Sequence, residues 1–469
     1  MATTYKLEIL VVEKSNISEL ALRTKIINTL PNANGQSVIY VMSRDQRITD
    51  NFGLAYAQDY ALRHKLPLAV VFCFSPVKGR AREHVVFMIE GLREIETTLA
   101  KLAIPFIALF GPHDVVLRNI AHHTKPALMV TDYSPLRGTL RWQNVLSQTV
   151  PLCIVDSHNI VPPWLVSNKQ EYSARTIRPK IYLHYNDFIH HHSTIKKHPY
   201  RWPGAVMNLK EVAENLTLYI NQHTPNNTHS GFTAGETAAQ QHLQHFIDTK
   251  LHGYAHSRND PTKQHTSDLS PYLHFGQIGS VSVMNAVSAA VVANAALQND
   301  ADALQEELVI RKELADNYCN YNQDYTTLRG APEWSRRTLQ KHETDPRNYI
   351  YSLQELETAS THDLAWNAAQ RQLTATGKMH GYMRMYWAKK VLEWSKDAQE
   401  AQQKLIYLND FYSIDGGDPN GYVGALWSIA GLHDRPWGER PVYGTVRSMV
   451  YNGLKRKFDI EAYIQKYET

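Results

Sequence analysis

Cysteine is scarce in this chain, and several other signatures are missing with it. The three cysteines, Cys73, Cys153 and Cys319, lie far apart and form no C-x-x-C pair. A zinc cluster or the disulfide framework of a small secreted protein is therefore not expected. Residues 1–13 also lack the basic segment, apolar core and small cleavage residues of a signal peptide. We therefore expect a protein of the reducing cytoplasm.

No common nucleotide-binding or hydrolase motif is present. The chain contains neither G-x-x-x-x-G-K-[ST] nor G-x-G-x-x-G after its first strands, and neither H-E-x-x-H nor G-x-S-x-G. Any nucleotide that it holds must be bound in another way. The uncharged residues 278–297 match the length of a membrane span, but their three serines, two asparagines and one glycine favour a buried helix of a soluble protein.

Length and composition indicate a globular protein of two large domains or about three smaller ones. The 469 residues are 43% hydrophobic and 20% charged, which excludes a disordered or fibrous chain. The net charge is only +4, yet residues 433–458 hold six Arg or Lys against two acidic residues. This basic segment suits a polyanion, with a solvated surface face as the alternative.

The first third of the chain alternates short apolar runs with amphipathic segments. Strands are expected at residues 37–42, 66–74, 104–110, 127–132 and 150–156. Between them, residues 82–102 repeat apolar side chains every three or four positions, which predicts a helix. Because parallel strands need crossover helices, residues 20–160 are predicted to form a doubly wound parallel sheet, Rossmann-like in its α/β layering.

Residues 161–236 follow a looser pattern. Prolines and polar residues interrupt them, which is typical of a long interdomain linker. Histidines gather within the stretch 184–198, but no cysteine is near and their spacing matches no metal-ligand pattern, so no metal is expected.

Helical stretches dominate from residue 237 to residue 469, which predicts an all-helical second domain. They are expected at residues 237–251, 277–297, 301–318, 362–372, 379–400 and 443–458.

Two segments of this half carry groups suited to ligand binding. Ser270 directly before Pro271 resembles an N-cap with proline at the first helical position, and such a helix start could bind a pyrophosphate. An ordinary capped helix is the alternative. Glu307 and Arg311 lie four residues apart, which favours a surface ion pair. The functional interpretation directs Glu307 to a substrate and Arg311 to a cofactor.

Aromatic and acidic residues mark further candidates. Trp387 and Trp394 lie seven residues apart on one predicted helix, and Trp366 precedes them. They could be core residues, or a wire along which an oxidised site draws electrons from the surface. Asp415 and Asp418 belong to a polar loop that lacks the spacing of an EF-hand. In the basic segment, aromatic residues alternate with arginines, which suits unstacked bases.

Several long runs together resemble one family. They include RNDP at 258–261, LSPYLHFGQI at 269–278, DPNGY at 418–422 and HDRPWGER at 433–440, with further runs at 379–394, 170–180 and 44–51. With these runs, the chain is similar over nearly its whole length to class II cyclobutane pyrimidine dimer DNA photolyases of the photolyase/cryptochrome family.

The resemblance implies light-driven DNA repair by a deoxyribodipyrimidine photo-lyase, a carbon–carbon lyase. An electron from excited FADH⁻ would split a cyclobutane pyrimidine dimer that has been flipped out of UV-damaged DNA, single- or double-stranded. A second antenna chromophore, a deazaflavin or a folate, would occupy the α/β domain. We expect a monomer without membrane attachment, in the cytoplasm at the nucleoid, or in the nucleus of a eukaryote.

The resemblance also implies roles for single residues. Those expected to bind FAD are Tyr254, Ser267, Leu269, Ser270, Arg311, Arg384, Asn409, Asp415 and Asp418. Among them, Arg384 and Asp415 would form a salt bridge beside the flavin ring, and Asn409 would face flavin N5. The residues expected at the lesion and the DNA are Glu307, Met385, Trp427, Arg435, Trp437, Arg440 and Arg447. Electrons for flavin photoreduction would pass through Trp366, Trp387 and Trp394.

One position departs from the class I enzymes, and two rival functions share the fold. Ile310 stands where class I enzymes carry a tryptophan, three residues after the substrate glutamate, so the aromatic contact is expected from Trp427 instead. A cryptochrome-like photoreceptor without repair activity is the main alternative, but Glu307 and the basic segment favour repair. A 6-4 photolyase would call for a histidine pair at the lesion, and the local pattern offers no obvious one.

Overall fold

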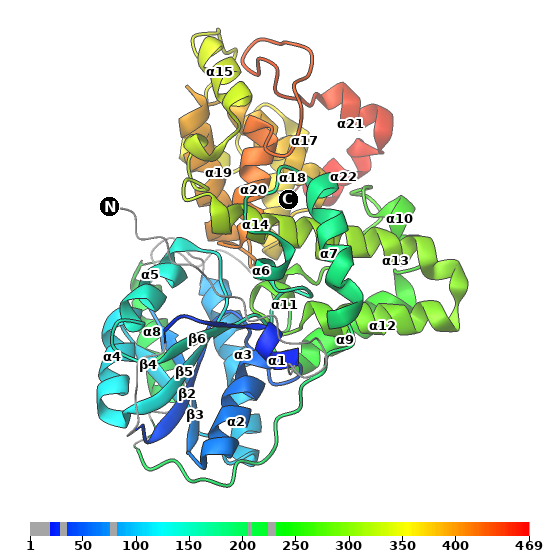
Figure 1. Ribbon diagram of the computed structural model, residues 1–469. Coiled ribbons are helices and arrows are strands. Elements are labelled where there is room, and N and C mark those ends of the chain that lie inside the picture. Colours follow the sequence, from blue (N-terminus) through cyan, green and yellow to red (C-terminus); the bar gives the residue numbers. More distant parts are fainter. Residues whose placement is uncertain are drawn as a thin grey trace.

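A computed structural model describes residues 19–28, 35–75, 82–204, 206, 209–223 and 231–468 (Figure 1). A sheet with its flanking helices forms one end of the molecule, and the remaining helices stand over the edge of that sheet. One sequence interpretation, the absence of a signal peptide at residues 1–13, lies outside the described residues.

The sheet has six strands in the order β1-β6-β5-β2-β3-β4. They are β1 (Thr24–Ile26), β2 (Ser37–Met42), β3 (Leu68–Phe74), β4 (Phe106–Phe110), β5 (Pro126–Asp132) and β6 (Leu152–Val155). The five strands expected from the sequence are parallel. The edge strand β1 was not predicted, and it runs antiparallel to β6. Its three residues are partly exposed and carry no apolar run, so the sequence gives no strand signal there.

Helices cover both faces of the sheet, which confirms the doubly wound fold. Helices α2 (Phe52–His64) and α3 (Arg82–Lys101) pack on the face formed by Val38, Tyr40 and Met42. On the opposite face, α4 (His113–Thr124) and α5 (Arg137–Leu146) pack against alternate strand residues, including Ile39 and Val41. Since both faces are buried, the strands read as unbroken apolar runs. A short helix α1 (Glu19–Leu22) precedes β1.

The region interpreted as a linker contains helices α6 (Pro163–Val166), α7 (Ala174–Phe188) and α8 (Leu209–His223). Helix α8 returns to the α/β part and packs on α3 and β4, whereas α7 packs against the helical half. One hydrophobic core also runs from the sheet into the first helices of the second half. We propose residues 20–160, 161–236 and 237–469 as α/β domain, linker and helical domain.

The regular elements of the second half are all helices in its described part, apart from an isolated bridge between Arg440 and Gly444. Its elements are α9 (Glu236–Thr249), α10 (Tyr254–Ser257), α11 (Ser270–His274), α12 (Ser280–Ala293), η1 (Ala295–Leu297), α13 (Gln298–Gln305), η2 (Glu306–Arg311), α14 (Lys312–Tyr321), η3 (Leu328–Gly330), α15 (Glu333–Lys341), α16 (Leu353–Glu357), α17 (Leu364–Thr376), α18 (Gly381–Glu393), α19 (Ala398–Tyr412), α20 (Pro419–Ala430), α21 (Tyr451–Lys457) and α22 (Ile460–Lys466). Among the described residues, no helix has both the length and the apolar character that a membrane span requires.

Two predicted helices end differently in the structure. The stretch 379–400 is divided into α18 and α19, because Asp397 accepts a hydrogen bond from the Glu400 amide and starts a new helix there. The stretch 443–458 is helical only in α21. Gly444 has a φ of +55°, and its backbone pairs with that of Arg440, so the chain turns tightly before the helix begins.

Candidate functional site

A cavity in two parts lies among the helices of the second half. The larger part has a volume of about 720 Å³, and the smaller part has about 340 Å³. The parts adjoin, because they share wall residues that include Tyr254, Ser267, Ser270, Glu307 and Arg311. Binding sites for small molecules and cofactors commonly occupy about 300–1,000 Å³, so this space can hold a large cofactor and a second ligand beside it.

The residues predicted to bind the cofactor and the lesion line this cavity. The wall of the smaller part contains every residue expected to bind the cofactor: Tyr254, Ser267, Leu269, Ser270, Arg311, Arg384, Asn409, Asp415 and Asp418. The wall of the larger part contains the three residues expected at the lesion, Glu307, Met385 and Trp427. Glu307 belongs to both walls and therefore stands at the junction.

The start of α11 differs from the predicted cap. Ser270 is the first helical residue and Pro271 the second, so the N-cap position falls to Leu269, whose side chain makes no capping bond. The backbone of Asp268 has a φ of +54°, and this turn sets the helix start one residue earlier than the Ser-Pro pattern predicts. The hydroxyl of Ser270 therefore makes no cap and lies in the cavity wall, where it can bind a ligand.

The segment η2 is a π-helix inserted between α13 and α14. A π-helix brings residues five apart onto one face, and such insertions are frequent at functional sites. Arg311 Nε accordingly donates to Glu306 Oε1 at 3.0 Å. The surface pair of Arg311 with Glu307, which the spacing offered as the alternative to their functional roles, is therefore not formed. Arg178 of α7 binds the same Glu306 carboxylate at 3.0 Å, so Glu307 is left to face the cavity.

Glu307 has a partner that sequence reasoning did not assign. Arg258 Nη1 lies 2.8 Å from Glu307 Oε1, and both side chains line the larger part of the cavity. The RNDP run contains this arginine, but the run carried only the resemblance and gave the residue no role. The pair places hydrogen-bond donors and acceptors side by side, which matches the mixed polar edge of a pyrimidine.

Arg384 makes a different contact from the one expected. Its Nη1 donates to the amide oxygen of Asn409, and both terminal nitrogens lie 3.5 Å from Ser413 Oγ. Asn409 lies in the last turn of α19 and Ser413 directly follows that helix, and their oxygens hold the guanidinium in place of Asp415. The predicted Arg384–Asp415 salt bridge is thus not formed in this structure, although both residues line the smaller part.

Asp418 is fixed by two residues, Asn420 and His274. Its carboxylate caps α20 by accepting from the Asn420 amide at 2.9 Å, and His274 Nδ1 lies 3.2 Å away. Burial alone would raise the pKa of Asp418, but His274 beside it holds that pKa well below its usual range. Asp418 and His274 also line a third cavity, of about 260 Å³, at the edge of the sheet.

The donor set of the smaller part fits FAD. The hydroxyls of Ser267 and Ser270 and the guanidinium of Arg311 are groups that bind phosphate oxygens. The amide of Asn409, oriented by its bond to Asp410 at 3.0 Å, can bind the polar edge of a flavin ring. At Gly381 a Cβ would meet no atom within 4 Å, so the wall has room at the start of α18.

The three tryptophans expected to relay electrons lie in contact. The rings of Trp366 and Trp387 stack with centroids 6.3 Å apart, and Trp394 meets Trp366 edge-on at 5.7 Å. Trp366 is thus the middle ring. Trp394 is only 2% exposed, so the outer end of the series does not itself reach solvent. Tyr351 and the exposed His362 contact Trp394 at 5.4 and 5.2 Å and lie between it and the surface.

The basic residues of the predicted DNA surface lie on the loop between α20 and α21. Trp437 is 40% exposed, with the Arg447 and Arg435 guanidinium carbons 4.7 and 5.5 Å from its ring centroid. Arg440 is exposed on the same loop. These side chains form an arginine-flanked aromatic projection outside the cavity.

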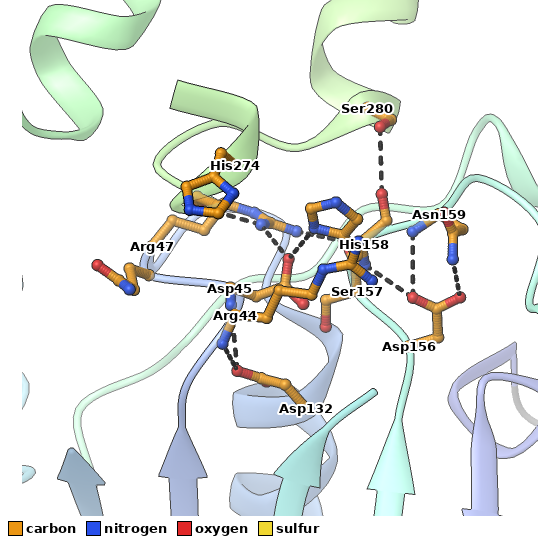
Figure 2. Close-up of polar contacts among 12 residues, drawn as sticks. Arg44, Asp45, Arg47, Asp132, Asp156, Ser157, His158, Asn159, His274 and Ser280 are labelled. Atoms are coloured by element: carbon orange, nitrogen blue, oxygen red, sulfur yellow. Dashed lines mark hydrogen bonds and ion pairs between the residues drawn. The ribbon is translucent and has the colours of Figure 1, made fainter. Parts of the chain in front are cut away.

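A buried polar network joins the sheet to the helical half at the carboxyl ends of β2, β5 and β6 (Figure 2). Arg44 donates from both terminal nitrogens to Asp316 of α14, at 2.7 and 2.8 Å. Burial alone would lower the pKa of Arg44, but Asp316 raises that pKa above its ordinary value, so the arginine stays charged. Arg47 binds Asp45 at 2.7 Å and the Gly276 carbonyl at 3.0 Å.

The same network reaches the cavity wall. Lys312 Nζ donates to the carbonyl of His158 and to Asn159 Oδ1, both at 2.9 Å. Ser280 binds the His158 carbonyl from the other side, as Figure 2 shows. Because Lys312 and His158 line the smaller part, the carboxyl edge of the sheet contributes directly to the site.

The histidine-rich stretch attaches the linker to the α/β part of the chain. His192 lies 3.3 Å from Asp50, and His198 Nε2 lies 2.9 Å from the Leu66 carbonyl oxygen. Over the described residues, no group of three or more His, Cys, Asp or Glu is arranged to hold a metal ion.

Comparison with known proteins places the chain in a family. The DNA photolyase family model matches residues 38–199. The chain is 43% identical to the deoxyribodipyrimidine photo-lyase of Potorous tridactylus over 92% of this chain and 81% of that protein. It is 41% identical to the Arabidopsis thaliana protein of the same name, over 91% of this chain and 88% of that protein. A solved archaeal photolyase from Sulfolobus tokodaii, described with two FAD molecules, has a TM-score of 0.67 at 17% identity, over 92% of this chain and 90% of that one. With the sheet, the helical half and the cavity in place, these identities show that this protein belongs to the DNA photolyase family.

Proposed function

We propose that this protein repairs cyclobutane pyrimidine dimers in DNA with light, as a deoxyribodipyrimidine photo-lyase that binds FAD. One observation carries the proposal: residues suited to a flavin and residues suited to two fused pyrimidines line two parts of one cavity. The names of the relatives, at 43% and 41% identity over most of their length, support the same activity.

Reduced FAD bound in the smaller part would supply, on absorbing light, the electron that opens the cyclobutane ring. Ser267, Ser270 and Arg311 would hold its phosphates. Arg384 and Asn409, joined by their hydrogen bond, would present one guanidinium and one amide to the ring. The protein thus supplies position and electrostatics.

The larger part would receive the dimer after it leaves the duplex. Two fused pyrimidines stack and pair weakly, so extruding them costs less than flipping intact bases; photolyases are among the standard examples of base flipping. Glu307 and its partner Arg258 would bind the polar edges of the bases, while Met385 and Trp427 form the apolar wall. Donors held in place there would stabilise charge that develops on a pyrimidine carbonyl. Trp437 and Arg447 would fill the gap left in the helix.

We also propose class II membership, a monomer, and an antenna chromophore in the third cavity. That cavity lies at the carboxyl edge of the sheet, where ligands of open α/β sheets bind. Its wall includes His84 and Phe275, whose rings meet edge-on at 4.7 Å, and this aromatic surface suits a flat deazaflavin or folate ring. The proposed place of action is wherever the cell keeps its DNA: the nucleoid in the cytoplasm, or the nucleus in a eukaryote.

The experiment that tests the function uses the whole protein with chemically reduced FAD and DNA that contains cyclobutane dimers. Under blue light we expect the dimers to disappear, and in the dark we expect them to remain. Undamaged DNA and 6-4 photoproduct DNA serve as controls. Binding of the dimer without light-dependent loss would favour a photoreceptor, and loss of 6-4 photoproducts instead would assign the other repair reaction.

Arg447→Ala is expected to weaken dimer-DNA binding and to flatten its salt dependence. Each lost phosphate contact lowers the slope of log K against log salt by about 0.9, because fewer condensed counterions are released. Fluorescence anisotropy between low and moderate salt measures the slope. Arg456→Ala is the matched control, because Arg456 is exposed on α21 and contacts no aromatic ring in the described part of the chain. Equal slopes for the wild type and Arg447→Ala would show that Arg447 contacts no phosphate.

A further inference from the structure

A separate annex opens beside the larger part of the cavity. It has a volume of about 260 Å³. It shares Asn259, Tyr382, Met385 and Trp427 with the wall of the larger part, so the two spaces adjoin where the lesion is proposed to lie. None of the residues that sequence reasoning assigned to the cofactor lines it.

Three cations line this annex: Lys389 from α18, Arg447 from the loop before α21, and Lys457 from the end of α21. Within the described part of the chain, none of them forms an ion pair with a carboxylate. Arg447 lies over the ring of Trp437, and Lys457 Nζ is 4.1 Å from the ring centroid of Tyr382. One acid, Asp434, also lines the annex, so the charge of the wall is net positive.

Lys389 is the most unusual of the three. It is only 5% exposed, and among the described residues its ammonium has one hydrogen-bond acceptor, the Ser428 carbonyl oxygen at 2.6 Å. A lysine ammonium has three protons to donate, and a buried charge without a close counterion is costly. Burial lowers the pKa of Lys389 to about 8, although Asp434 opposes the shift. At neutral pH the side chain is still mostly charged and lacks an anion.

We propose that Lys389, Arg447 and Lys457 form a binding site for a phosphate group of the DNA strand that carries the dimer. The proposal rests on the proposed function, because it takes the larger part of the cavity as the place of the extruded dimer. Bases in that cavity stay covalently tied to their sugars and phosphates, and a backbone phosphate must therefore pass close to the shared wall. A phosphodiester would give the Lys389 ammonium the counterion that the protein does not supply.

The test scans the backbone of a short dimer-containing DNA with single methylphosphonates, which remove the charge of one phosphate at a time. Dark binding to the flavin-loaded protein is measured for the wild type, Lys389→Met, Lys457→Met and the control Lys455→Met. Lys457 is exposed, so its replacement leaves the fold intact even if Lys389→Met is unstable. The control Lys455→Met removes the same charge from the same helix as Lys457→Met. The Lys455 side chain, however, is 63% exposed and lies outside the annex.

We expect one position near the dimer at which the neutral linkage weakens wild-type binding roughly tenfold, the size of a charge-assisted hydrogen bond. At that position Lys389→Met and Lys457→Met should lose less than about twofold, and Lys455→Met should behave as the wild type, because coupled partners show non-additive losses. Equal sensitivity of all four proteins at every position would overturn the proposal.

Free inorganic phosphate is the other possible source of the same anion. If inorganic phosphate alone binds the wild type and not Lys389→Met while the methylphosphonate profiles of the two agree, the annex binds free phosphate and the DNA assignment is wrong. Illumination of the same samples with reduced flavin reports on repair separately. Positional coupling without loss of dimers would support the phosphate site while refuting the repair function.

Discussion

Trp394→Phe is expected to block light-driven reduction of oxidised flavin in this protein. Trp394 contacts Trp366 at 5.7 Å on one side and Tyr351 at 5.4 Å on the other, so it connects the buried tryptophans to the aromatic residues near the surface. A phenyl ring fills most of the space but is far harder to oxidise than an indole. The absorption spectrum of the flavin during illumination with an external reductant measures the loss, which should be nearly complete.

Repair by protein that has been reduced chemically should survive the same substitution, since the relay is needed only to reach the reduced state. Trp334→Phe is the matched control, because Trp334 on α15 packs in the same core but contacts none of the three relay rings. Equal loss of photoreduction and of repair in Trp394→Phe would show that the ring supports the structure and does not relay electrons.

Arg44→Met is expected to lower the free energy of unfolding by about 3–5 kcal/mol, the usual cost of leaving one partner of a buried ion pair alone. Asp316 would lose both hydrogen bonds from the Arg44 guanidinium, in a position that is almost completely inaccessible to solvent. Urea unfolding followed by circular dichroism measures the change. Because this pair joins β2 to α14, retention of flavin should fall as well.

Two further variants separate this effect from a simple change of charge. Arg63→Met removes an exposed pair with Asp59 at 2.8 Å, and such pairs contribute at most about 1 kcal/mol. The double variant Arg44→Met with Asp316→Leu should recover much of the lost stability, because no buried charge is left without a partner. If Arg44→Met and Arg63→Met cost the same, the Arg44–Asp316 pair does not hold the two halves together.

The sheet could be predicted because its signal is local. Five strands buried on both faces give unbroken apolar runs. The apolar spacing of residues 82–102 predicts a helix, and the helix that forms, Arg82–Lys101, has almost the same bounds. The strand β1 escaped because it depends on pairing with β6 more than 120 residues later, and its own side chains are partly exposed. The predicted helix at residues 443–458 failed for a local reason, since the backbone of Gly444 pairs with that of Arg440 in a tight turn that a helix cannot contain.

The wall of the candidate site could be listed from family resemblance, but its contacts could not. A rule based on spacings of three and four residues cannot detect a π-helix. It therefore offers Glu307 as the alternative surface partner of Arg311, whereas Arg311 binds Glu306. The partner of Glu307, Arg258, lies 49 positions earlier, and only the fold brings the two together. Nothing in the sequence of α18 distinguishes Lys389 from its neighbour Lys390, because only the fold shows which of the two lines the annex.

Flavin binding by the pure protein decides whether the helical half holds FAD beside a space for a pyrimidine dimer. The measurement is the absorption spectrum of the purified chain, followed by titration with FAD of any flavin-free fraction. We expect a yellow or blue protein with a flavin spectrum, or one that takes up added FAD stoichiometrically. A colourless protein that binds no added FAD would contradict this expectation.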